Sequence, residues 1–195
     1  MAEAAPDARA AALREVQAAI RASDLPGATA RALVALDAGI EHPMLLNLRA
    51  LKAEEEGRAA DALPDLQRAH ELAPNDFTVV NALGLCLARL ERYAEAAAAF
   101  DKAIKLEPRF APAHHNKGWV SELAGDLEGA RRCHLQALKM NPDFIEASAA
   151  LAMMAVRAGD MATARREAER ILDKDRNQPT AQVALAAAEI DEGHF

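Results

Sequence analysis

Small apolar residues return along this chain every 34 residues, and larger apolar residues stand between them. Alanine occurs at Ala62, Ala96 and Ala130, and again seven residues after each of these. Larger residues such as Leu83 and Leu87 are four apart, the spacing that places side chains on one face of an α-helix. A fixed period of this length indicates a stack of similar supersecondary units that bury their apolar faces against one another.

Proline and glycine mark the expected ends of the helices. Proline ends a helix because it lacks an N–H and clashes with the preceding turn, and it recurs at Pro74, Pro108 and Pro142. Glycine readily adopts the left-handed conformation that stops a helix. It stands 17 residues before Pro74 and Pro142, at Gly57 and Gly125, and at the equivalent Gly159 of the next repeat. The pattern predicts helices over 7–22, 26–38, 43–56, 60–72, 77–90, 94–106, 111–124, 128–140, 145–158, 162–174 and 179–192.

The small residues predict close contact between the two helices of each unit. When the proline is numbered 32 within its unit, positions 8 and 20 hold mostly alanine or glycine, which lets two helices approach closely. The remaining core is expected to be filled by larger apolar residues, namely Leu83, Leu87, Phe100, Ile104, Leu106, Leu135, Leu138 and Met140.

Composition supports an all-α protein and restricts its partners. The 195 residues are 51% hydrophobic but only 4% aromatic, and alanine, the most frequent residue, has the highest helix propensity. The net charge of −7 weighs against a general nucleic-acid binder. No uncharged apolar stretch is long enough to cross a membrane, and the acidic N-terminal residues do not resemble a secretory signal peptide. We therefore expect a cytoplasmic protein in which Cys86 and Cys133 stay reduced.

The 34-residue pattern resembles the tetratricopeptide repeat family. Its third unit carries the family's residues most completely, with Val80, Leu83, Gly84, Leu87, Ala96, Phe100, Ala103 and Pro108. The end units depart from the pattern, since the first lacks the final proline and the fifth has Arg176 in its place. The resemblance implies an all-α, right-handed α-solenoid with repeats at about 9–42, 43–76, 77–110, 111–144 and 145–178 and a terminal helix at 179–192.

In this family the first helix of each repeat lines a concave groove, which implies that the chain is a protein-interaction scaffold. The groove-facing positions of this chain carry Asn47, Leu51, Asn81, Leu85, Arg89, His115, Asn116, Trp119, Glu122, Met153 and Arg157. An asparagine amide both donates and accepts hydrogen bonds, so it can pair with a peptide backbone. Trp119 is a candidate anchor for an apolar side chain. The same residues also allow a purely structural interpretation, with leucines in the core and amides in solvent.

No residue pattern indicates catalysis, a cofactor or a metal. The adjacent His114 and His115 are expected on different faces of their helix, whereas His134 falls at a core position. No pair of histidines has the helical spacing of a metal site, and nucleophile and phosphate-loop motifs are missing. The arginine pairs Arg131–Arg132 and Arg165–Arg166 fall on second helices, where we expect solvation or a partner contact.

The last three residues, Gly193 to Phe195, match the turn that precedes a second helix in other repeats. Residues 179–192 could be a capping helix, or the chain could be the first part of a longer bacterial protein. Arrays of this type resemble those that precede sulfotransferase or 2-oxoglutarate-dependent hydroxylase domains, which makes an accessory or dimerisation domain the alternative function. An uncovered final helix would expose Leu185 and Ile190 and could form a homodimer through the end of the array.

Overall fold

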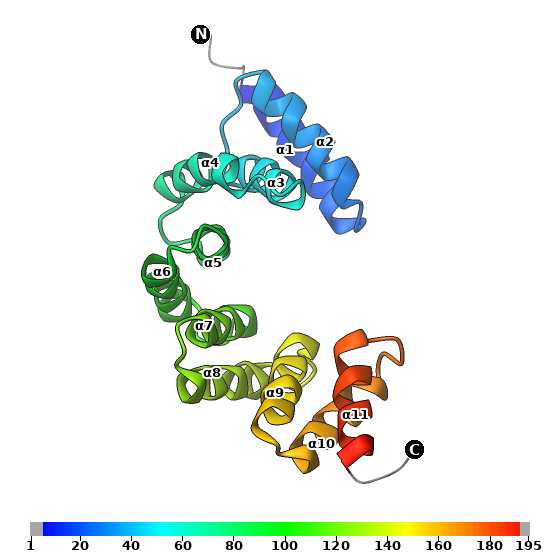
Figure 1. Ribbon diagram of the computed structural model, residues 1–195. Helices are drawn as coiled ribbons and strands as arrows, with labels where there is room; N and C mark the ends of the chain where they lie inside the picture. The colour runs from blue at the N-terminus through cyan, green and yellow to red at the C-terminus, as the bar shows by residue number, and fades with distance from the viewer. Residues whose placement is uncertain (1–5, 192–195) are drawn as a thin grey trace. The chain divides into compact units, whose positions relative to one another are not determined.

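The computed structural model describes residues 6–191, and every regular element in that range is an α-helix (Figure 1). The helices are α1 (Pro6–Arg21), α2 (Leu25–Asp37), α3 (Pro43–Glu55), α4 (Ala59–Leu72), α5 (Phe77–Arg89), α6 (Tyr93–Leu106), α7 (Ala111–Leu123), α8 (Leu127–Met140), α9 (Ile145–Ala158), α10 (Met161–Leu172) and α11 (Pro179–Asp191). Over the described residues, the helix ends lie within two residues of those predicted from the sequence.

The chain forms two compact units, Met1–Leu106 and Glu107–Phe195. In the first unit, α1–α2, α3–α4 and α5–α6 pack as hairpins, and each hairpin contacts the next. The second unit contains the hairpins α7–α8 and α9–α10, with α11 packed against both α9 and α10. No helix among residues 6–191 is long and apolar enough to cross a membrane.

One backbone position in each repeat turns the chain from the first helix to the second. Gly57, Gly125 and Gly159 have φ values of 75°, 81° and 74° there, as predicted. Ser23 and Glu91 occupy the same position in other repeats and also have positive φ values, 57° and 59°. The left-handed turn is therefore a requirement of the hairpin, and glycine meets that requirement with the least strain.

The residue after this turn starts the second helix. Asp24, Asp126 and Asp160 each accept a hydrogen bond from the backbone N–H three residues later, at 2.8–3.0 Å. These are N-caps, which satisfy N–H groups that have no partner within the helix. Arg58 and Arg92 stand at the same position in the second and third repeats, and each binds a carboxylate of its own helix at 2.7 Å.

The two helices of a hairpin touch where a glycine faces a buried ring. In the first unit, a Cβ atom on Gly84 would lie 2.7 Å from the ring of Phe100. In the second unit, a Cβ atom on Gly118 would lie 2.6 Å from the ring of His134. Both rings have no exposed surface, so neither can move aside without disturbing the core.

The other hairpins fill the same contact with different pairs of side chains. Val16 and Ala32 share the first core cluster, and Ala50 and Leu66 share the next. In these four hairpins a larger residue on one helix is thus matched by a smaller one on the other, whereas the α9–α10 hairpin has Ala152 and Ala168 at the same two positions. This matching explains why the residue at position 8 changes together with the residue it faces on the second helix.

The final helix shows where one sequence expectation was wrong. Leu185 was expected to be exposed, but it packs against the core cluster formed by α9, α10 and α11. Ile190 is exposed as expected, at 60%, and Val183 is exposed at 56%. The exposed large apolar residues of α11 are therefore Val183 and Ile190, and not Leu185 and Ile190 as predicted.

We predict that Gly84→Ala lowers the free energy of unfolding by about 1–3 kcal/mol, because the added methyl overlaps the ring of Phe100. Urea denaturation measures this change. The double variant Gly84→Ala, Phe100→Leu recreates the Ala50–Leu66 pair and should lose less than the two single variants added together. Simple additivity of the two single changes would contradict the packing explanation.

Candidate functional site

The groove-facing residues predicted in the first unit lie on α3 and α5, two first helices that contact each other. Asn47, Leu51 and Leu85 are half-buried, and Arg89 is exposed. Asn81 is almost fully buried, with 8% of its surface exposed. Leu51 and Leu85 therefore contribute to packing and also retain accessible apolar surface.

Arg89 forms an ion pair with Glu54 of the preceding repeat. The Glu54 side chain is only 8% exposed, while that of Arg89 is 45% exposed. Burial raises the pKa of Glu54, and the charge of Arg89 acts in the opposite direction. Burial, together with the nearby Glu54, raises the pKa of Cys86 to about 11, so this thiol is unreactive at neutral pH.

The same ion pair recurs in the second unit between α7 and α9. Arg157 Nη2 lies 2.6 Å from Glu122 Oε2, again 35 residues apart in sequence. The other oxygen of Glu122 lies 3.1 Å from Nε2 of the buried His134. Each pair links the first helices of neighbouring repeats, but Glu122 has a second partner that the sequence did not reveal.

His115 packs into the second unit. Its ring centroid lies 5.0 Å from that of His134 and 5.5 Å from that of Phe144. Burial, and then the neighbouring His134, lower the pKa of His115 to about 4. Burial also lowers the pKa of His134, although Glu122 opposes that shift. Both imidazoles are therefore neutral at pH 7 and join α7, α8 and the start of α9.

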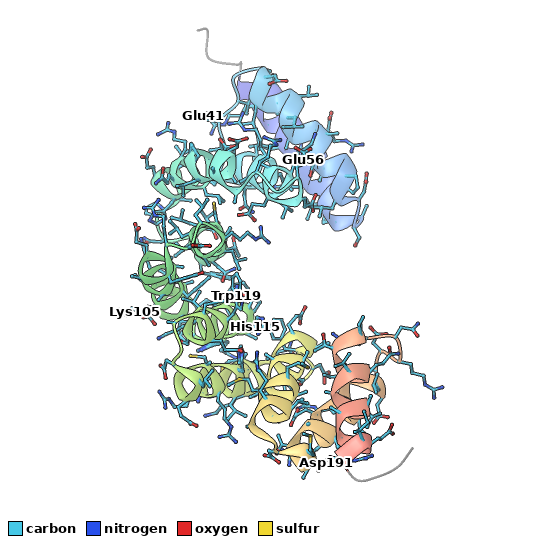
Figure 2. All side chains as sticks on the ribbon, in the orientation of Figure 1. Glu41, Glu56, Lys105, His115, Trp119 and Asp191 are labelled. Atoms are coloured by element: carbon cyan, nitrogen blue, oxygen red, sulfur yellow. The ribbon has the colours of Figure 1, made fainter. Side chains whose placement is uncertain are left out.

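The other predicted residues of the second unit have different surroundings. Trp119 and Asn116 are half-buried on α7, and Figure 2 labels Trp119 and His115 on that helix. Met153 packs against the core cluster of α9, α10 and α11. Of these three, Trp119 borders an open pocket.

This pocket has a volume of about 630 Å³ and lies between the hairpins α7–α8 and α9–α10. Trp119 and four leucines contribute to its lining, and three of these leucines are exposed. Leu123, Leu127 and Leu135 are 47%, 57% and 44% exposed. Leu135 was predicted to be a core residue, and that prediction was wrong. The volume of the pocket falls in the range typical of ligand pockets in proteins.

Changes between repeats account for the opening. At the equivalent place two repeats earlier, Leu63 and Leu90 pack against a filled core cluster. Arg131 and Ala158 stand 68 residues after them and line the pocket instead. Replacing two leucines by an arginine and an alanine removes apolar volume that would otherwise fill the space.

The pocket leucines follow the opposite trend. Residues 68 positions before Leu123, Leu127 and Leu135 are glutamate, alanine and glutamine. Compared with the equivalent interface two repeats earlier, the pocket therefore has two fewer leucines in the core and three more leucines on the surface. This exchange of leucines is visible in the sequence when the repeats are aligned at their interface positions, but it does not involve the positions that define the family.

Metal-binding chemistry finds no support in the part of the chain that the structure describes. Within residues 6–191, no three histidine, cysteine or acidic side chains are grouped so that they could hold a metal ion. Cys86 and Cys133 are not joined by a disulfide. The site therefore offers apolar surface, amides and ion pairs.

Three tetratricopeptide repeat models match the chain, over residues 78–110, 99–132 and 124–181. Together these matches extend over more than half of the sequence. The chain belongs to the tetratricopeptide repeat family. Its fold is the all-α solenoid class of helical hairpins that the sequence predicted, and this family fold supports protein–protein interaction in general. No curated protein sequence matches the chain.

Several solved tetratricopeptide repeat structures are similar to this one. The protein TTC0263 of Thermus thermophilus is 21% identical, with a TM-score of 0.77 over 93% of this chain and 99% of that one. PilW, a type IV pilus biogenesis factor, is 23% identical, with a TM-score of 0.79 over 97% and 88% of the two chains. YrrB, described as having an unusual peptide-binding site, is 27% identical, with a TM-score of 0.59 over 72% of each chain.

We predict that His115 makes stability depend on pH between 6.5, its ordinary pKa, and about 4. Its folded-state pKa is lowered, so its contribution is complete above pH 6.5 and is lost as the pH falls towards 4. The loss reaches up to about 3 kcal/mol. His115→Asn introduces the residue found at this position in the second and third repeats. Urea denaturation from pH 7 to pH 4 should give a smaller decrease for this variant, and equal decreases would contradict the prediction.

The two equivalent ion pairs provide a matched comparison. Arg89→Ala should lower the free energy of unfolding at pH 7 by about 2 kcal/mol, because Glu54 would remain nearly buried without its cation. Arg157→Ala should cost less than about 1 kcal/mol, because Glu122 keeps its contact with His134. Urea denaturation of both variants measures the difference, and an equal or reversed order would contradict this account.

Proposed function

We propose that this tetratricopeptide repeat protein is a non-catalytic scaffold that binds a peptide segment of a partner protein on the first helices of its repeats. The observation that carries the proposal is the apolar pocket beside Trp119, where the second helices α8 and α10 extend the surface of the first helices α7 and α9. A pocket next to a half-exposed tryptophan suits a protein interface, where binding energy is concentrated in a few large side chains.

Polar groups near the apolar surface support recognition of a peptide. Asn47 on α3 and Asn116 on α7 carry amides that both donate and accept hydrogen bonds. Half-buried Leu51 and Leu85 add apolar surface in the first unit. Packed helices hold these side chains in place, so that binding loses less conformational entropy than it would on a flexible loop.

Similarity to YrrB is consistent with this proposal, because the described feature of that protein is a peptide-binding site. The smaller apolar volume at residues 131 and 158 leaves space for the pocket on which the proposal rests. We further propose that the protein acts in a bacterial cytoplasm, where free thiols such as Cys86 remain reduced. No specific observation favours the alternative of an accessory domain for a sulfotransferase or hydroxylase.

A random peptide library selected against the whole protein tests the proposal. Enriched peptides should bind Trp119→Ala at least about tenfold more weakly than wild type, measured by fluorescence anisotropy of the labelled peptide. Val34→Ala is the matched control, because Val34 is 70% exposed on α2 of the other unit, and its affinity should equal that of wild type. Failure to enrich any peptide, or equal binding by Trp119→Ala, would count against the proposed function.

A further inference from the structure

The lining of the α7–α10 pocket contains more acidic than basic side chains. Its charged residues are Glu122, Glu128, Asp160, Glu167, Arg131, Arg157 and Arg166. Four carboxylates against three guanidinium groups give the lining one net negative formal charge. This charge has the same sign as the net charge of −7 on the whole chain. A surface with excess negative charge attracts cationic segments and repels acidic ones.

Two of the three arginines are held by acids of the same lining. Arg157 Nη2 lies 2.6 Å from Glu122 Oε2, with the imidazole of His134 on the other oxygen. Arg166 Nε lies 3.5 Å from Glu167 Oε1. An acidic partner would therefore have to compete for these arginines with carboxylates that are already in place.

The third arginine, Arg131, acts on Asp160. Hydrogen bonds from Thr163 lower the pKa of Asp160, and one of them makes this carboxylate the N-cap of α10. The positive charges of Arg166 and Arg131 lower this pKa further. Arg131 and Asp160 therefore offset part of each other's charge within the lining.

Glu128 is the acid that these arginines leave over. Its side chain is exposed in the first turn of α8, and no ion pair joins it to any residue between 6 and 191. The equivalent residues of the other repeats are uncharged, namely Pro26, Ala60, Ala94 and Ala162. The carboxylate without a cation is therefore particular to the repeat that forms the pocket.

Exposed leucines accompany Glu128 in the lining. Leu127 is its neighbour on α8, and Leu123 is the last residue of α7. Their side chains are 57% and 47% exposed, and Trp119 borders the same space. Burying the leucines requires an apolar partner, whereas covering Glu128 without a cation costs the free energy of taking its charge out of water. A segment that carries both apolar and basic side chains meets both requirements.

We propose that the α7–α10 pocket binds a segment of a partner protein that combines apolar side chains with lysine or arginine. The apolar side chains cover the exposed leucines beside Trp119, and a basic side chain pairs with Glu128. An acidic segment would bring a like charge to Glu128 and bind more weakly. This inference rests on the proposed function, since it names the chemistry of the partner for the same pocket.

The probes are the peptides that a random library enriches against the whole protein. Lysine and arginine should outnumber aspartate and glutamate in them. Each peptide is compared with a copy in which glutamate replaces every lysine and arginine. Fluorescence anisotropy should show at least about tenfold weaker binding of the copy to wild type. The difference should shrink as salt is added, because salt screens exposed charges.

A charge reversal at Glu128 tests the proposed pairing. Glu128→Lys should bind the basic peptides at least about fivefold more weakly than wild type, because an attraction becomes a repulsion. Glu15→Lys is the matched control, since it makes the same change of charge at an exposed position on α1 of the other unit. It should bind these peptides like wild type, and circular dichroism checks that both variants stay helical.

The inference is wrong if the enriched peptides are neutral or acidic, or if Glu128→Lys binds basic peptides as tightly as Glu15→Lys does. Neutral or acidic peptides that still require Trp119 would leave the scaffold function in place and reject only the partner chemistry. Failure to enrich any peptide, or equal binding by Trp119→Ala, would reject the scaffold function and this inference together. Basic peptides that require both Trp119 and Glu128 would support both.

Discussion

Close contact between the two helices of each hairpin is the constraint on which the rest of this structure depends. The contact has room for one large side chain, and its partner on the facing helix must then be glycine or alanine. Phe100 against Gly84 and His134 against Gly118 are the tightest examples, since a Cβ atom on either glycine would overlap the ring. Packing this close limits what evolution can change at one position without changing the other.

This constraint leaves the interface between consecutive hairpins freer to vary. In the first unit, leucines fill that interface and build a closed core around Ala50 and Leu66. In the second unit, His134 fills the hairpin contact, while Arg131 and Ala158 replace two interface leucines and a pocket opens. The same repeat architecture thus supports a closed interface in one place and an open pocket in another, without a change in the helices themselves.

The helices could be predicted from the sequence because their signals are local. Glycine turns, prolines after second helices and the 34-residue spacing of alanine each reflect backbone geometry within one repeat, and the end repeats keep that geometry even where Arg176 replaces proline. The pocket could not be predicted in this way. Its lining combines four helices from two repeats, and Leu135 is exposed because its position on the helix faces outward, as the exposed Gln67 does at the same position two repeats earlier.

The recurrent ion pair shows how such differences can separate stability from recognition. Glu54 relies on Arg89, and the residue equivalent to His134 in that repeat is Leu66, which cannot donate a hydrogen bond. Glu122 is held by both Arg157 and His134. A carboxylate from a bound segment could therefore share Arg157 while the half-buried Glu122 keeps its imidazole partner. In the first unit the same exchange would leave the nearly buried Glu54 with the Cys86 thiol but without its cation, which costs more free energy than an exposed contact returns. The histidine that fills the hairpin contact thus also gives Glu122 a partner that does not depend on Arg157.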